Sequence, residues 1–177
     1  MAMAFNAEPE RDPDVVITHP NRDKPVVKAT RATVIVLLLV SAALVAIVTI
    51  GGWSALSGMI PVQIAYVIVY VTLAYYAFRW KMGVLPVAAA LAVLLMIFAA
   101  VAGPGWFNRD SAGYEATAIG ADVLGLLTLL IVPVQILLVA FAMRGFQQGW
   151  NVELERRSPA AAPPDTGGYA SPPPHPA

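Results

Sequence analysis

The polar and apolar positions of this chain form four long apolar runs between Ala32 and Met143, separated by short polar segments. Only six charged residues interrupt this window: Arg79, Lys81, Arg109, Asp110, Glu115 and Asp122. A helix needs about 20 predominantly apolar residues to cross roughly 30 Å of hydrocarbon. The pattern therefore predicts four transmembrane helices, over about residues 33–50, 59–80, 84–102 and 120–143.

Glycine and proline mark the ends of the predicted helices. The first run ends at residues 51–53, Gly-Gly-Trp, and the third ends at residues 103–105, Gly-Pro-Gly. Pro61 lies in the first turn of the second helix, where its missing N–H costs no hydrogen bond. These breaks predict a short first loop, a tight basic turn before the third helix, and an outer loop over residues 103–119.

Lys and Arg residues near the predicted helix ends are divided unequally between the two sides. Nine fall on the side that carries both termini: Arg22, Lys24, Lys28, Arg31, Arg79, Lys81, Arg144, Arg156 and Arg157. The opposite side has only Arg109. Because positive residues stay on the cytoplasmic side, we expect a plasma (inner) membrane protein with both termini in the cytoplasm. Four tryptophans fall at predicted membrane interfaces, as in an aromatic belt: Trp53, Trp80, Trp106 and Trp150.

The chain is predicted to have three parts: a polar N-terminal tail over residues 1–31, a transmembrane domain over 32–150, and a Pro-rich tail over 151–177. Both tails are expected to be largely disordered, because such segments cannot bury enough apolar surface to offset the entropy of ordering. The Pro-rich tail serves as a spacer or docks into an aromatic groove in polyproline form. The expected fold class is an all-α integral membrane protein with four transmembrane helices in an up-down bundle.

The composition agrees with a membrane protein and excludes several functions. The chain is 58% hydrophobic and 12% charged, whereas soluble domains carry about 25% charged residues. Its formal net charge of zero gives no reason to expect a nucleic-acid partner. The chain contains no cysteine, which excludes disulfides, thiolate catalysis and Cys-bound metals. The two histidines, His19 and His175, lie in the tails, so we expect no haem, metal or other cofactor.

Polar side chains within two of the predicted helices form the first candidate site. The second helix carries three of them on one face, at i, i+3 and i+7: Gln63, Tyr66 and Tyr70. The fourth helix carries three residues that interrupt its apolar run: Thr128, Pro133 and Gln135. With a rise of about 1.5 Å per residue, Thr128 should lie level with Gln63 and Tyr66, and Gln135 level with Tyr70. We predict that these two faces meet inside the bundle.

Two interpretations of these polar faces stay open. The first is a set of hydrogen bonds that join the helices, worth on average about 0.6 kcal/mol each. The second is a small polar cavity for a ligand or a lipid headgroup. Pro133 is compatible with both interpretations. It leaves the Leu129 carbonyl without its helical donor, and a carbonyl in lipid needs another partner.

A second candidate cluster lies in and beside the outer loop: Arg109, Glu115 and Asp122. Asp122 lies at the start of the fourth helix, where the positive end of the helix dipole favours a carboxylate. Arg109 is expected to pair with Asp122 across the loop. A cap at the helix end is one role for this cluster. An enzyme acting on an envelope lipid would have to use the same residues together with Tyr114, although their spacing matches no catalytic motif.

The sequence favours a non-catalytic membrane protein. We expect an accessory or scaffold component that contacts membrane lipids and either a membrane-protein partner or a second copy of itself. The alternative is a small transporter, channel or lipid-binding protein that uses the Gln/Tyr face. Ion coupling normally needs an acidic residue near the midplane of the membrane, and the predicted membrane interior has none.

Overall fold

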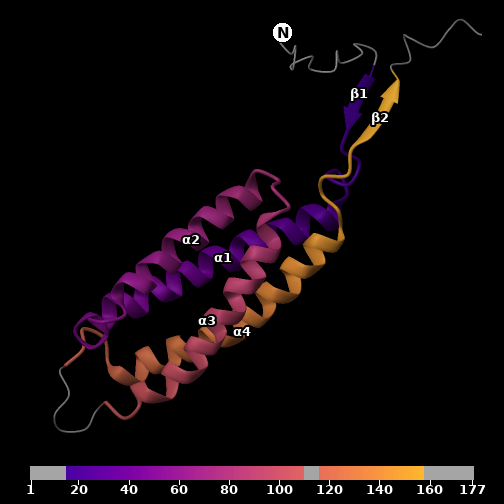
Figure 1. Ribbon diagram of the computed structural model, residues 1–177. Helices are drawn as coiled ribbons and strands as arrows, with labels where there is room; N and C mark the ends of the chain where they lie inside the picture. The colour runs from indigo at the N-terminus through magenta and orange to yellow at the C-terminus, as the bar shows by residue number, and fades with distance from the viewer. Residues whose placement is uncertain (1–14, 110–115, 158–177) are drawn as a thin grey trace, which may run out of the picture. The chain divides into compact units, whose positions relative to one another are not determined.

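The computed structural model describes residues 15–109 and 116–157, and four helices make up most of this part. The helices are α1 (Pro25–Gly51), α2 (Ile60–Phe78), α3 (Val84–Trp106) and α4 (Ala121–Gln147), with a short 3-10 helix, η1 (Trp53–Leu56), after α1 (Figure 1). All four helices are long and apolar enough to cross a membrane. The prediction of four helices with the length and composition of membrane spans is therefore confirmed.

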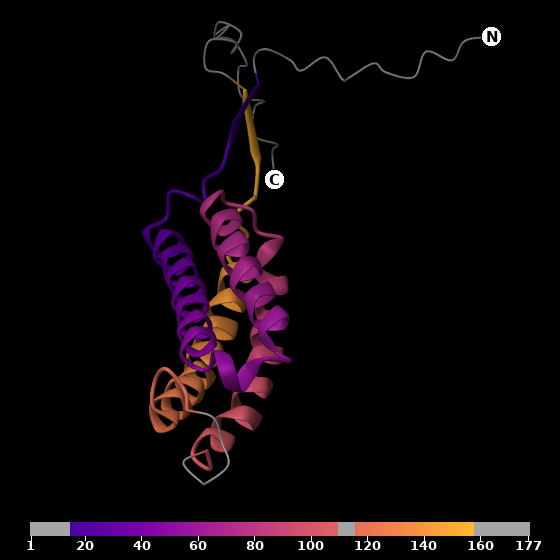
Figure 2. The same cartoon turned by 90° about the vertical axis from the view of Figure 1, so that its left-hand side faces the viewer.

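The helices pack in an unequal way. α3 lies along α4 in the most extensive contact, and α1 contacts both α2 and α4, whereas α2 and α3 touch little (Figure 1). Figure 2 shows the same helices after a turn of 90°. Small residues allow the close approaches. Ala88 and Ala92 of α3 are fully buried. At Gly103, an added Cβ would lie only 2.5 Å from Cδ2 of Leu129 on α4.

Three helix boundaries differ by four or more residues from the prediction, and one of them is the end of α4, which lies at Gln147 instead of about residue 143. α1 begins at Pro25 instead of about residue 33, because proline fits the first turn of a helix without losing a hydrogen bond. α3 continues through Gly103, Pro104 and Gly105 to Trp106, where a break was predicted. The Trp106 side chain is only 4% exposed and belongs to a buried apolar cluster with residues of α1 and α4. Burial of this large ring offsets the hydrogen bond that Pro104 removes from the helix.

The start of α1, the end of α2 and the end of α4 meet at one end of the bundle, which we call the Trp80 end. Trp150 is fully buried there, and its ring centroid lies 5.9 Å from that of Trp80. The Asn21 side-chain amide donates hydrogen bonds to the carbonyl oxygens of Gln148 (3.3 Å) and Gly149 (3.0 Å). These contacts hold the segment before α1 against the end of α4.

The opposite end of the bundle, which we call the Trp106 end, joins the first loop to residues that precede α4. The Ala118 N–H donates to the Gly51 carbonyl (3.0 Å), and the Ser54 hydroxyl donates to the Ala116 carbonyl (3.3 Å). Trp53 is 55% exposed, as an interfacial tryptophan would be. Trp106 and Trp150 are buried packing residues instead, which corrects the prediction of four belt tryptophans.

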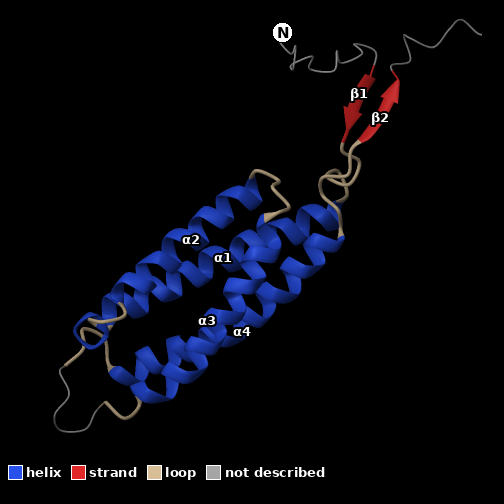
Figure 3. Cartoon of the chain, viewed as in Figure 1, coloured by secondary structure: helices blue, strands red, loops and turns tan. Residues whose placement is uncertain are grey.

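Two short strands belong to a unit separate from the four helices. β1 (Val15–Thr18) pairs antiparallel with β2 (Leu154–Arg157), and Val15 lies opposite Arg157 (Figure 3). Both strands fall in the tails that were predicted to be largely disordered, and the sequence analysis did not expect them. The β-branched residues of β1 favour a strand, and pairing satisfies those backbone groups of each strand that face the other strand. The rest of the two tails, residues 1–14 and 158–177, lies outside the described residues.

Candidate functional site

Three buried polar side chains form a hydrogen-bonded network across the centre of the bundle. The Tyr70 hydroxyl on α2 donates to Oε1 of Gln135 on α4 at 3.0 Å. Nε2 of Gln135 then donates to Oγ of Ser41 on α1 at 2.8 Å. Ser41 in turn donates to the Leu37 carbonyl at 2.7 Å. The three side chains have no exposed surface, so this network joins three helices in a dry environment.

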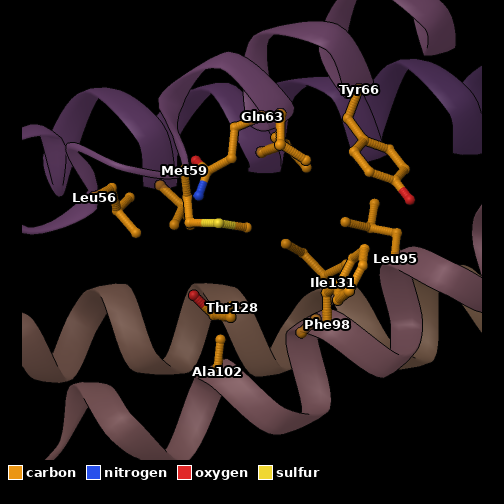
Figure 4. A pocket seen from close by; sticks show the side chains of 13 residues that line it. Leu56, Met59, Gln63, Tyr66, Leu95, Phe98, Ala102, Thr128 and Ile131 are labelled. Atoms are coloured by element: carbon orange, nitrogen blue, oxygen red, sulfur yellow. The ribbon is translucent and has the colours of Figure 1, made fainter.

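A second polar contact joins α1 and α2 nearer the Trp106 end. The Thr49 hydroxyl lies within hydrogen-bonding distance of both Oε1 of Gln63 and the Val45 carbonyl. A hydroxyl has one proton, so it donates to one of these oxygens at a time. The Gln63 side chain is half-buried and faces the space between α2 and the α3–α4 pair (Figure 4).

That space is a pocket of about 130 Å³, which residues of all four helices line. Three of the polar residues predicted from the sequence lie on its wall: Gln63, Tyr66 and Thr128 (Figure 4). Most of the remaining lining is apolar and includes Leu95, Phe98 and Ile131. The Thr128 hydroxyl donates to the Leu124 carbonyl of its own helix at 2.7 Å. The pocket is therefore an apolar space with a few polar groups at its edge. An apolar cavity of about 150 Å³ admits a molecule the size of benzene.

The two polar faces predicted from the sequence thus come together at two levels. Gln135 meets Tyr70 directly, whereas Thr128 lies level with Gln63 and Tyr66 across the pocket. The Tyr66 and Tyr70 rings also contact each other edge to face, with centroids 5.8 Å apart and planes at 82°.

Pro133 does not belong to this polar face, which corrects the prediction. It is exposed, whereas Thr128 and Gln135 are buried. A helix turns by about 100° per residue, so Thr128 and Gln135, seven residues apart, share one side. Pro133 precedes Gln135 by two residues and therefore lies on the opposite side. The helix continues without interruption from Ala121 to Gln147.

The predicted outer cluster is described only in part. Asp122 lies exposed in the first turn of α4, as expected for a carboxylate near the positive end of the helix dipole. The Arg109 guanidinium carbon lies 5.1 Å from the centroid of the Trp106 ring. Glu115 lies outside the described residues, and so does Tyr114. The pairing of Arg109 with Asp122 stays a prediction.

Ser41 and Thr49 of α1 are site residues that the sequence analysis missed. They are hydroxyl residues in an otherwise apolar run, and a comparison of depths that included the first helix would have found them. Ser41 lies near the middle of α1, as Gln135 lies near the middle of α4. Serine and threonine also bond to carbonyls of their own helix, so their presence alone does not indicate a contact between helices.

This arrangement can hold helices together and can admit a small apolar molecule at the pocket. Within residues 15–109 and 116–157, no group of three or more His, Cys, Asp or Glu side chains is placed to hold a metal ion. No protein-family model, no curated protein and no solved structure matches the chain.

Proposed function

We propose that this chain is a multi-pass protein of the plasma membrane that acts as a non-catalytic accessory or scaffold component of a membrane complex. The network of Tyr70, Gln135 and Ser41 is the observation that carries this proposal. At the centre of the bundle these side chains bond to one another. A permeating ion or polar solute needs groups that exchange their protein contacts for contacts with the solute. Side chains that are already paired with one another favour a role in holding the helices together.

In this proposal the four helices form an up-down bundle with both termini in the cytoplasm. The grouping of positive side chains supports this orientation, because Arg22, Arg31 and Arg79 lie at the Trp80 end, whereas Arg109 lies next to Trp106 at the opposite end. Such an asymmetry is typical of the cytoplasmic side. A reporter domain fused after Trp150 is expected to read out in the cytoplasm. A reporter signal from the outer side would contradict the orientation.

We assign the outer surface of α2 to the partner. α2 is the least buried of the four helices and contacts α3 little. Its exposed side carries an apolar stripe with the spacing i, i+4, i+7 and i+11: Ile64, Ile68, Val71 and Tyr75. Such spacing places the four side chains along one face of the helix, where a helix of another membrane protein or of a second copy can pack.

Affinity purification from native membranes in a mild detergent tests this function. We expect a reproducible second membrane protein or a homo-oligomer, and Ile68→Trp should weaken that association because it adds bulk to the stripe. Ile136→Trp is the matched control, because Ile136 is similarly exposed (54% against 60%) but lies on α4. A chain that purifies alone as a monomer would contradict the accessory role.

The pocket supports a second candidate function, which is the binding of a lipid chain or another small apolar molecule. Gln63 and Tyr66 place an amide and a phenol on the wall of an otherwise largely apolar space. Ala102→Leu would fill part of this space. If the purified protein carries a lipid in native mass spectrometry and this variant loses it, the lipid-binding role gains support over the accessory role.

A further inference from the structure

A groove of about 440 Å³ lies at the Trp80 end, between the start of α1 and the end of α2. Its lining combines two cations, two aromatic rings and two aliphatic side chains: Lys28, Arg31, Phe78, Trp80, Ile35 and Val36. Lys28 and Arg31 are three residues apart on α1 and therefore share one face of the helix. Ile35 and Val36 follow one turn further along the same helix, away from its start. Along α1, the groove thus changes from cationic to apolar.

Arg31 is held in the groove by aromatic contacts. Its guanidinium carbon lies 4.0 Å from the centroid of the Trp80 ring and 5.2 Å from that of Phe78. Contact with a ring face leaves the N–H groups at the edge of the guanidinium plane available for hydrogen bonds. Among the described carboxylates, none forms an ion pair with Arg31. The side chain is therefore positioned by the two rings and can still bind an anion.

Lys28 contributes a second positive charge on the same side. Nζ of Lys28 lies 3.7 Å from Oδ1 of Asp23, and both side chains are well exposed, at 57% and 89%. An exposed ion pair at this separation is weak and exchanges readily with other partners. A phosphate group can therefore displace Asp23 from Lys28.

The backbone of Trp80 adopts an unusual conformation, which fixes the direction of its ring. Trp80 has a φ of +60°, in the left-handed region that glycine usually occupies after the end of a helix. A side chain at this position costs free energy, and contacts of the ring can offset this cost. The ring contacts Trp150 and Arg31, and the Arg22 guanidinium carbon lies 5.7 Å from its centroid. The strained backbone thus presents the aromatic wall of the groove.

We propose that this groove binds one anionic phospholipid. The phosphate lies between Lys28 and Arg31, and an acyl chain lies along Ile35 and Val36. The order of the lining residues along α1 matches the order of headgroup and hydrocarbon in such a lipid. This inference rests on the proposed insertion with the Trp80 end in the cytoplasmic leaflet, where anionic lipids attract basic residues.

Native mass spectrometry of the full chain, released from nanodiscs, tests the proposal. The nanodiscs contain phosphatidylcholine with or without phosphatidylglycerol. We expect one retained phosphatidylglycerol in preference to phosphatidylcholine. Lys28→Gln and Arg31→Gln should each weaken its retention by about fivefold, the typical contribution of one cation near an anionic surface. Arg31→Lys keeps the charge but loses the planar guanidinium that the two rings hold, so it should retain only part of the binding.

The matched controls are Lys81→Gln and Arg144→Gln, which remove the same charges at exposed positions outside the groove. They should change retention little. Equal losses of retention in the groove and control variants would overturn the proposal, because they would indicate diffuse attraction to the whole basic end. A wild-type chain that shows no preference for phosphatidylglycerol would also overturn it. The reporter after Trp150 tests orientation independently, so a failure of the lipid site is distinguishable from a failure of the proposed function.

Discussion

The Tyr70 hydroxyl lies 3.0 Å from Oε1 of Gln135, and neither side chain has any exposed surface. The backbones of α2 and α4 have few close contacts, so the tyrosine spans the distance between the two helices with its full length. In an apolar core, removal of one partner leaves the other without a hydrogen bond. This contact therefore helps to determine where α2 sits on the α1–α4 pair.

Tyr70→Phe should lower the free energy of unfolding by about 0.6 kcal/mol and by no more than about 1.7 kcal/mol, the average and the largest value measured for hydrogen bonds between membrane helices. The ring stays in place and only the donor to Gln135 is lost. Unfolding in bicelles by titration with sodium dodecyl sulfate measures the change. Tyr76→Phe is the control, because Tyr76 is 44% exposed on the same helix. Equal losses for the two variants would contradict a specific role of the Tyr70 hydroxyl.

Gln135→Leu should destabilise the bundle more than Tyr70→Phe, because Gln135 bonds to both Tyr70 and Ser41. The two changes should not be additive. Once Gln135 is leucine, the Tyr70 hydroxyl has lost its acceptor, so Tyr70→Phe should cost about 0.5 kcal/mol less than in the wild type, or recover some stability. The same unfolding measurement on the four members of this double-mutant cycle gives the coupling. Strict additivity would show that the bond contributes nothing.

Part of this site could be predicted from the sequence because depth along a helix is simple to calculate. Gln135 and Tyr70 were expected at the same level, and the structure brings them together. The prediction placed Pro133 on the same face because it interrupts the apolar run, but it took no account of the direction in which each residue points around the helix axis. Pro133 lies on the other side of α4. Ser41 was missed because a lone hydroxyl residue in an apolar helix normally bonds to its own backbone.

The fold was predictable to a similar extent. The apolar runs located four helices, but their ends depend on contacts between residues far apart in the chain. The glycines and the proline at residues 103–105 indicated a break, and only the burial of Trp106 against α1 and α4 explains why α3 continues. Trp150 likewise has the position of a belt residue in sequence, whereas its burial depends on packing against Trp80 and Gly145.

Gly103→Ala should destabilise the protein by about 1 kcal/mol or more, the lower range for overpacking in a tight core. The added methyl would lie 2.5 Å from Cδ2 and 2.8 Å from Cγ of Leu129, so either the Leu129 side chain has to move or α3 and α4 have to separate. Gly105→Ala is the matched control, two residues away in the same helix, because a Cβ there meets nothing within 4 Å. Unfolding of both variants in the same detergent gives the difference between their free energies of unfolding. Both variants gain helix propensity from the change of glycine to alanine, so most of this gain cancels in the difference. If the two variants have equal stability, the close approach at Gly103 is not required.

Trp150→Phe should loosen the Trp80 end of the bundle. The change removes the hydrogen bond that Nε1 of Trp150 donates to Oε1 of Gln148 (3.2 Å). It also removes part of a fully buried ring that contacts Trp80 edge to face. We expect a loss of about 1 to 2 kcal/mol, since a buried hydrogen bond and some buried apolar volume disappear together. Hydrogen exchange of backbone amides should become faster at residues 148–152 before it does so in the centre of α4.

Trp53→Phe is the control, because Trp53 is 55% exposed, and it should change stability by no more than about 0.5 kcal/mol. Unchanged protection of residues 148–152 in Trp150→Phe would show that the hydrogen bonds of Asn21 and Arg22 hold this end without the indole.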